Sequence, residues 1–99
     1  YYQLYPEYEL NKGFADFLFK PSPSVPVLPP FTYLLEVKYA KAGASEKEIR
    51  ILADEARGQL LRYSEDELVA EARAKGELKL ITIVWRSWEL ALLEEVTLS

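Results

Sequence analysis

The 99-residue chain contains no cysteine, no histidine and no methionine. Without cysteine it forms no disulfide, and it offers neither a thiolate metal ligand nor a cysteine nucleophile. Without histidine, the common zinc sites, serine triads with an imidazole base and histidine pH switches are excluded as well. Any chemistry must therefore come from carboxylates, Lys, Arg, Tyr, Ser or Thr.

Excess positive charge and long apolar runs are also lacking. The formal net charge of −4 argues against a domain that coats nucleic acid with a broad basic surface, while a local basic groove stays compatible with it. No apolar run approaches the ~18 residues of a membrane helix and no secretory signal is visible, so we expect a cytoplasmic protein without membrane contact. Because the chain opens at Tyr1, we expect a fragment or processed product of a longer protein.

The composition that is present suits one small globular domain. Hydrophobic residues make up 49% and charged residues 28% of the chain, which is typical of a folded protein rather than a disordered one. A chain of this size buries a little over ~60% of its unfolded surface and builds one core. We therefore expect residues 1–99 to form a single domain, whose oligomeric state does not follow from the sequence.

Two strand patterns, at residues 13–20 and 31–40, organise the sequence. Side chains alternate between the two faces of a strand, so Asp16 lies opposite the face of its apolar neighbours, and Glu36 and Lys38 share one face. The other face of the second strand carries an apolar row, Phe31, Tyr33, Leu35, Val37 and Tyr39. If the two strands pair, two carboxylates and an ammonium group converge on one side of a sheet.

A proline-rich segment joins these strands. Residues 21–30 hold five of the six prolines, and proline donates no ladder hydrogen bond. The segment would serve either as a ligand for a polyproline-binding partner or as a stiff connector, and the flanking strands favour the connector.

The remaining elements follow from turn and capping signals. Residues 1–10 predict an edge strand that a turn at residues 11–13 joins to the next strand. Ser45 and Glu48 form a capping box that begins a helix. Its apolar stripe consists of Ile49, Leu52, Ala53, Ala56, Leu60 and Tyr63.

The last third of the chain predicts a short helix and two strands. A second capping box, Ser64 with Glu67, predicts a helix over residues 65–75 that ends at Gly76. Residues 78–85 are apolar on both faces, which indicates a central strand. Residues 88–98 suit a helix almost as well as a strand, and we predict a strand that follows a tight turn at Arg86 and Ser87.

The charged face of the central strand pair suggests a metal site. Phosphodiester hydrolysis without histidine requires a hard divalent cation, and magnesium is usually held by one or two carboxylates with waters. Asp16 and Glu36 would supply these carboxylates, the carbonyl of Val37 would complete the shell, and Lys38 would orient or help to deprotonate the attacking water. The Glu-x-Lys spacing alone is common in soluble proteins, so it does not by itself establish catalysis.

A resemblance adds to this interpretation. The chain resembles the PD-(D/E)xK nuclease superfamily in residues 13–19, in residues 33–39 and in a helix with Ala56, Gln59 and Tyr63. The resemblance is closest to the subgroup found as a C-terminal domain behind an AAA-ATPase-like module. The resemblance covers about residues 7–96. Asp16, Glu36 and Lys38 match the motif residues, and Gln59 matches a glutamine that this subgroup often places on the following helix.

The resemblance implies both a fold and an activity. The fold is α/β (α+β), a restriction-endonuclease-like αβββαβ core with a central mixed β-sheet flanked by helices. The activity is cleavage of nucleic acid that depends on Mg²⁺ or Mn²⁺, with catalytic roles for Asp16, Glu36, Lys38 and Gln59. The implied partners are nucleic acid and an N-terminal ATPase-like domain of the same parent chain.

Two departures from the family pattern affect the site. Ala15 replaces the proline of the superfamily's name, a common variation. Many members also place a further Glu on a helix before the first strand, which this sequence does not include. Glu9 or Glu7 would stand in, with Glu9 as a tentative metal ligand, and the sequence does not choose between them.

Three interpretations of the function follow. The first is a metal-dependent endonuclease. The second is a catalytically silent domain of the same fold that acts as a binding or regulatory appendage of an ATPase, which the acidic charge balance favours. The third is an unrelated small α/β domain whose motifs arise by chance.

Overall fold

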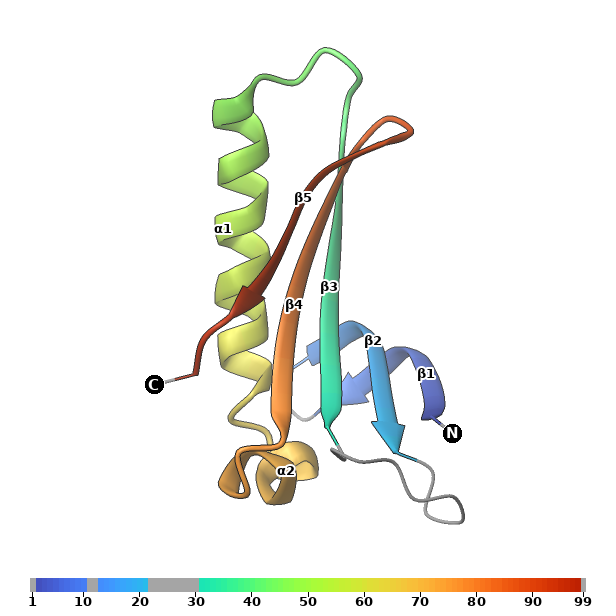
Figure 1. Cartoon of the computed structure of the whole chain (residues 1–99), viewed down its shortest axis with the longest axis vertical. Helices are drawn as coiled ribbons and strands as arrows, with labels where there is room; N and C mark the ends of the chain where they lie inside the picture. Colours follow the sequence, from blue (N-terminus) through green and yellow to red (C-terminus); the bar gives the residue numbers. More distant parts are fainter. Residues whose placement is uncertain (1, 11–12, 22–30, 99) are drawn as a thin grey trace.

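The computed structural model describes the backbone of residues 2–10, 13–21 and 31–98, and the side chains of residues 16–20 and 31–98. Five strands form one sheet, and a long helix lies along it (Figure 1). The elements in chain order are β1 (Tyr2–Leu10), β2 (Gly13–Pro21), β3 (Thr32–Ala40), α1 (Glu46–Tyr63), the 3₁₀ helix η1 (Glu67–Val69), α2 (Ala70–Ala74), β4 (Leu78–Arg86) and β5 (Glu89–Val96). The predicted α+β class with a mixed sheet is confirmed.

The strands lie in the sheet in the order β1-β2-β3-β4-β5. β3 and β4 run parallel, and the other neighbours run antiparallel. α1 lies within the crossover that this parallel pair requires. β3 is thus the strand at which the N-terminal strands meet the crossover unit.

The start of α1 follows its sequence signal. Ser45 is the N-cap, and its hydroxyl accepts a hydrogen bond from the Glu48 N–H at 3.2 Å. The predicted stripe turns toward the sheet, and its buried members are Ile49, Ala53, Ala56, Leu60 and Tyr63. Because these residues recur at helical spacing, one side of α1 covers the sheet and the other faces water.

The predicted second helix is shorter than expected. The segment contains the 3₁₀ turn η1 and the five-residue α2, and Asp66, not Ser64, caps it by accepting the Leu68 N–H at 2.8 Å. The Ser64 hydroxyl instead donates to the Leu61 carbonyl at 2.7 Å, because Ser64 still belongs to the end of α1. Gly76 follows α2 with φ of 71°, as the predicted helix end requires.

The last two strands form the predicted hairpin, with the turn displaced by one residue. Arg86 pairs with Glu89, so the turn consists of Ser87 and Trp88. Arg86 stays in β4, where its guanidinium contacts Glu89 at 2.6 Å and Glu46 at 2.9 Å. The strand interpretation of β5 is confirmed. The predictions for residues 11–12 and for the proline-rich segment at 22–30 lie outside the described residues.

α1 packs against one face of the sheet through two separate hydrophobic clusters. We call them the Leu80 cluster and the Val84 cluster. The Leu80 cluster contains Leu18, Leu34, Leu60, Tyr63, Val69, Leu78, Leu80 and Val96. The Val84 cluster contains Ala44, Ile49, Ala53 and Val84.

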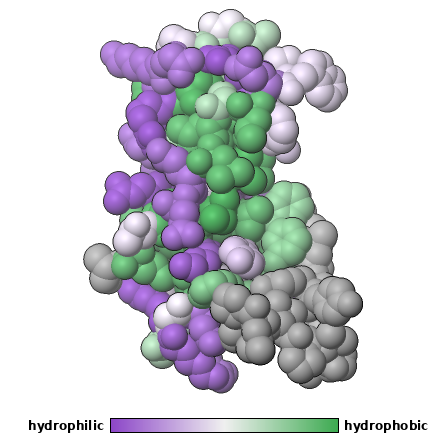
Figure 2. All heavy atoms as spheres, viewed as in Figure 1, coloured by the Kyte–Doolittle hydropathy of each residue, from purple (hydrophilic) through white to green (hydrophobic). Residues whose placement is uncertain are grey.

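The apolar row of β3 lies on the opposite face of the sheet. Its members are half-buried except Tyr39, which is 75% exposed, while the alternate residues from Thr32 to Glu36 are buried beneath α1. Figure 2 shows hydrophobic residues gathered along the strands and hydrophilic residues on the α1 side at the left. The helix therefore covers the face that carries the charged motif residues. The described part of the chain has no helix long and apolar enough to cross a membrane.

Candidate metal centre and active site

Polar side chains separate the two hydrophobic clusters. On β4, Thr82 lies between Leu80 and Val84 on the face toward α1, and in the parallel register it pairs with Glu36 of β3. Thr82 is 1% and Glu36 5% exposed. On α1, Gln59 lies between Ala53 of one cluster and Leu60 of the other. We call Glu36, Thr82 and Gln59 the polar layer.

Asp16 reaches the same place from β2. The β2–β3 pairing joins Leu18 to Leu34 and Phe17 to Leu35, and Asp16 is the next residue of β2 beyond the last pair. The Asp16 Oδ2 accepts a hydrogen bond from the Val37 N–H at 2.7 Å. The structure thus brings Asp16 onto the peptide between the motif glutamate and the motif lysine.

Lys38 lies at the rim of the polar layer. Its Nζ is 3.9 Å from the Glu36 Oε2, and its side chain is 23% exposed. The ammonium group therefore contacts both the buried carboxylate and the solvent. An ammonium group exposed to this extent could contact a phosphate that reached the site.

The pKa of the Glu36 carboxyl lies close to neutral pH. Burial raises its pKa from 4.5 to about 7, and the nearby Asp16 charge adds to the increase. Lys38 and a hydrogen bond with the backbone of Asp16 oppose the increase. Since metal ligands bind in their deprotonated form, a cation at this site would hold Glu36 ionised.

The chemistry of the oxygens around Glu36 fits a hard cation. Among the described residues, the buried atoms Glu36 Oε1, Gln59 Oε1 and Thr82 Oγ1 have no hydrogen-bond partner. An unpartnered buried oxygen costs free energy unless a water or an ion satisfies it. In the described part of the chain no three Asp or Glu side chains lie where they could together hold a metal ion. Two carboxylates, such as those of Asp16 and Glu36, match the number that magnesium usually takes from a protein.

The backbone of Val37 also faces Asp16. Within a strand, the N–H and the C=O of one residue point to the same neighbouring strand. The Val37 N–H donates to Asp16, so its carbonyl points to the same side of β3. This orientation suits the metal-ligand role predicted for that carbonyl.

The tentative additional ligand stays a prediction. Glu9 pairs with Phe14 in the β1–β2 register, and Glu7 lies between the pairs of Pro6 with Phe17 and Tyr8 with Ala15. The side chains of both glutamates lie outside the described residues.

Sequence reasoning assigned no role to two residues near the site. Burial raises the pKa of Tyr63, and the charges of Glu36 and Asp16 raise it further, which places the phenol in their electrostatic range. Its position four residues after Gln59, on the same helical face, was the available signal. Thr82 was hidden in a strand that is apolar on both faces, and its pairing with Glu36 appears only in the register.

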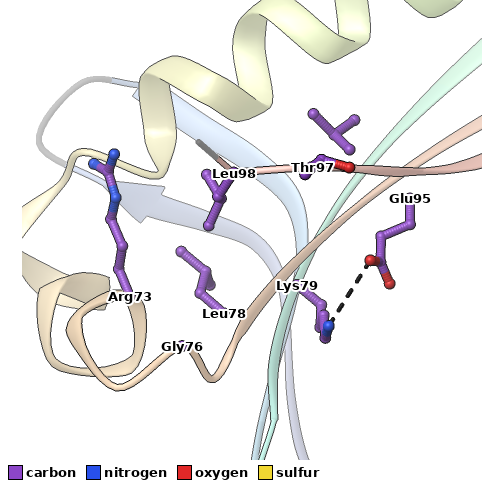
Figure 3. A pocket seen from close by; sticks show the side chains of 8 residues that line it. Arg73, Gly76, Leu78, Lys79, Glu95, Thr97 and Leu98 are labelled. Carbon is purple, nitrogen blue, oxygen red and sulfur yellow. Dashed lines mark ion pairs between the residues drawn. The ribbon is translucent and has the colours of Figure 1, made fainter.

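A separate cavity lies away from the polar layer. It has a volume of about 390 Å³ and lies between the end of α2 and the paired ends of β4 and β5 (Figure 3). Its cations have partners: Lys79 contacts Glu95 at 3.8 Å, and Arg73 donates to the Ser64 carbonyl at 3.4 Å. The motif residues do not line this cavity.

Comparison with known proteins agrees with this geometry. No curated protein and no solved structure matches the chain. A family model described as the PD-(D/E)XK nuclease superfamily matches residues 1–95, nearly the whole length. The chain belongs to the PD-(D/E)XK nuclease superfamily.

Proposed function

We propose that this domain hydrolyses phosphodiester bonds of nucleic acid with Mg²⁺ or Mn²⁺ as its cofactor. The hydrogen bond from the Val37 N–H to the Asp16 Oδ2 carries the proposal, because it holds the aspartate against the Glu36-Val37-Lys38 segment. Membership of a nuclease superfamily supports the reaction class.

The residues of the site would divide the work. Asp16, Glu36 and the Val37 carbonyl would hold the metal, which, when bound, supplies Lewis-acid stabilisation of the phosphodiester oxygens. The Lys38 ammonium would orient the attacking water and offset negative charge that develops on the phosphate. Gln59, whose amide oxygen is buried and without a partner, would contact the water or the metal ligands from α1.

A cleavage assay with matched lysine variants tests the proposal. Single- and double-stranded DNA and RNA would be incubated with the protein and Mg²⁺ or Mn²⁺. Lys38→Ala should reduce the rate by at least about 10²-fold, the lower range for a group that assists proton transfer. Lys41→Ala removes an exposed lysine just beyond β3 and should leave the rate unchanged. Equal cleavage by wild type and Lys38→Ala would assign the activity to a contaminant.

A binding or regulatory domain attached to an ATPase-like module is the second candidate function. The distribution of charge favours it, because several cations already contact carboxylates: Arg50, Lys75, Lys79 and Arg86. These contacts partly neutralise four of the twelve Lys and Arg residues, and the net charge of −4 argues against a broad basic surface for a nucleic-acid backbone. If the protein neither cleaved nucleic acid nor bound Mn²⁺, the nuclease proposal would be overturned and this candidate would remain.

A further inference from the structure

Thr82 is a buried polar residue without a role in the function proposed above. It is 1% exposed, and its Oγ1 has no hydrogen-bond partner among the described residues. Its neighbours on the same face of β4 are Leu80 and Val84. Valine has nearly the same shape and would avoid the cost of burying a hydroxyl, so packing alone does not account for threonine here.

The neighbours of Thr82 supply complementary hydrogen-bonding atoms. Glu36 lies beside it on the adjacent strand, about 4.8 Å away across the sheet. Gln59 lies on the part of α1 between the two hydrophobic clusters. In the ionised form of Glu36 its unpartnered Oε1 only accepts hydrogen bonds, as does the Gln59 amide Oε1, whereas a threonine hydroxyl also donates.

One water molecule placed among the three atoms would satisfy them all. It would accept a hydrogen bond from the Thr82 hydroxyl and donate its two hydrogens to Glu36 Oε1 and Gln59 Oε1. Buried waters typically make about three hydrogen bonds to polar groups that otherwise lack partners. No pair of these three atoms bonds directly, as a shared water between them requires.

We propose that Thr82 is a positioning residue of the metal site, which holds the Glu36 carboxylate in place through a water shared with Gln59. The Thr82 hydroxyl approaches the Glu36 carboxylate from the β4 side of β3. Asp16 lies on the β2 side, and Lys38 lies at the solvent-exposed rim. The link to metal binding rests on the proposed function. The contact between Thr82, the water and Glu36 does not.

Mn²⁺ binding measured by calorimetry at pH 8 tests the link to the metal. Removal of a group that orients a metal ligand typically weakens metal binding about 10- to 100-fold, and we expect this loss for Thr82→Val. Thr82→Ser keeps the hydroxyl and should keep most of the affinity. Thr32→Val makes the same substitution at a buried threonine of β3, on the face that carries Glu36, and should bind Mn²⁺ like wild type. Equal affinity of Thr82→Val and wild type would overturn the proposal.

A crystal structure of the metal-free protein provides a readout that is independent of metal binding. The expected result is an ordered water within hydrogen-bond distance of Thr82 Oγ1 and Glu36 Oε1 in wild type, and its loss in Thr82→Val. Such a water in a protein that binds no Mn²⁺ would support the contact and overturn the metal function. A wild-type structure without this water would overturn the role of Thr82 and leave the nuclease proposal intact.

Discussion

The Leu80 cluster and the polar layer both lie between α1 and the sheet, but burial stabilises the fold in the first and costs free energy in the second. Leu34, Leu60 and Leu80 are fully buried apolar side chains, and their burial stabilises the fold. Glu36 and Thr82 are buried to nearly the same extent, but Glu36 Oε1 and Thr82 Oγ1 have no hydrogen-bond partner among the described residues. A protein that only needed stability would fill this layer with apolar groups.

The difference shows which part of the core serves stability and which serves the site. Residues that oppose stability at a buried position are expected where function requires them. In this domain the two apolar clusters offset the cost of the polar layer between them. Removing apolar volume from a cluster should therefore lower stability, whereas removing the buried charge from the polar layer should not.

The largest expected effect is a loss of stability on truncating a side chain of the Leu80 cluster. Leu34→Ala should lower the free energy of unfolding by about 2–5 kcal/mol, because the substitution leaves a cavity among residues of the Leu80 cluster. Urea denaturation followed by circular dichroism measures this loss of free energy. The control is Tyr39→Ala on the same strand, where the side chain is 75% exposed and the loss should be much smaller. Similar losses for the two variants would contradict the assigned faces of β3.

A second prediction concerns the pH dependence of stability without divalent ions. Glu36 has a pKa of about 7 in the folded protein and 4.5 as the reference for the unfolded chain. Because the folded state holds this proton more tightly, its stabilising effect is complete below pH 4.5 and is lost as pH rises through 7. The loss is on the order of 3 kcal/mol.

Glu36→Gln tests this dependence, since glutamine does not titrate. The variant should be more stable than wild type at pH 8 in EDTA and of similar stability at pH 4.5, while it loses Mn²⁺ affinity. Denaturation curves at both pH values measure the difference. Parallel pH profiles for the two proteins would show that the carboxyl of Glu36 is not held near neutrality.

Much of this arrangement could be predicted from the sequence because it depends on local periodicity. Strand alternation placed Glu36 and Lys38 on one face, and helical spacing identified the buried side of α1. Alternation does not say which face the crossover helix covers, so the apolar row on β3 gave no indication that α1 lies over the charged face. That choice is made by tertiary packing.

Two residues that sequence reasoning misjudged have hydrogen bonding that depends on a neighbouring strand or helix. The role proposed for Thr82 depends on Glu36, which lies 46 positions earlier and pairs with it across the sheet. Ser64 carries a helix-start signal, but α1 extends to Tyr63, and the hydroxyl therefore serves the helix end. For Thr82, a neighbouring strand supplies the group that its hydroxyl can serve. For Ser64, the end of α1 uses the hydroxyl that the sequence assigned to the next helix.

The smallest predicted effect stabilises the helix above the polar layer without entering it. Gly58 lies in α1 on its exposed side, next to Gln59, and a Cβ there would meet no atom within 4 Å. Gly58→Ala should raise the free energy of unfolding by about 0.5–1 kcal/mol, because alanine loses less backbone entropy in a helix. Gly76→Ala is the matched control: it also has open space, but φ is +71° there, and the substitution should destabilise. Because Gly58→Ala leaves Glu36 untouched, its stability curve should shift upward by a constant amount at every pH. A change in the shape of that curve would show that the helix backbone and the buried carboxyl are coupled, and the separation between the apolar clusters and the polar layer would then be wrong.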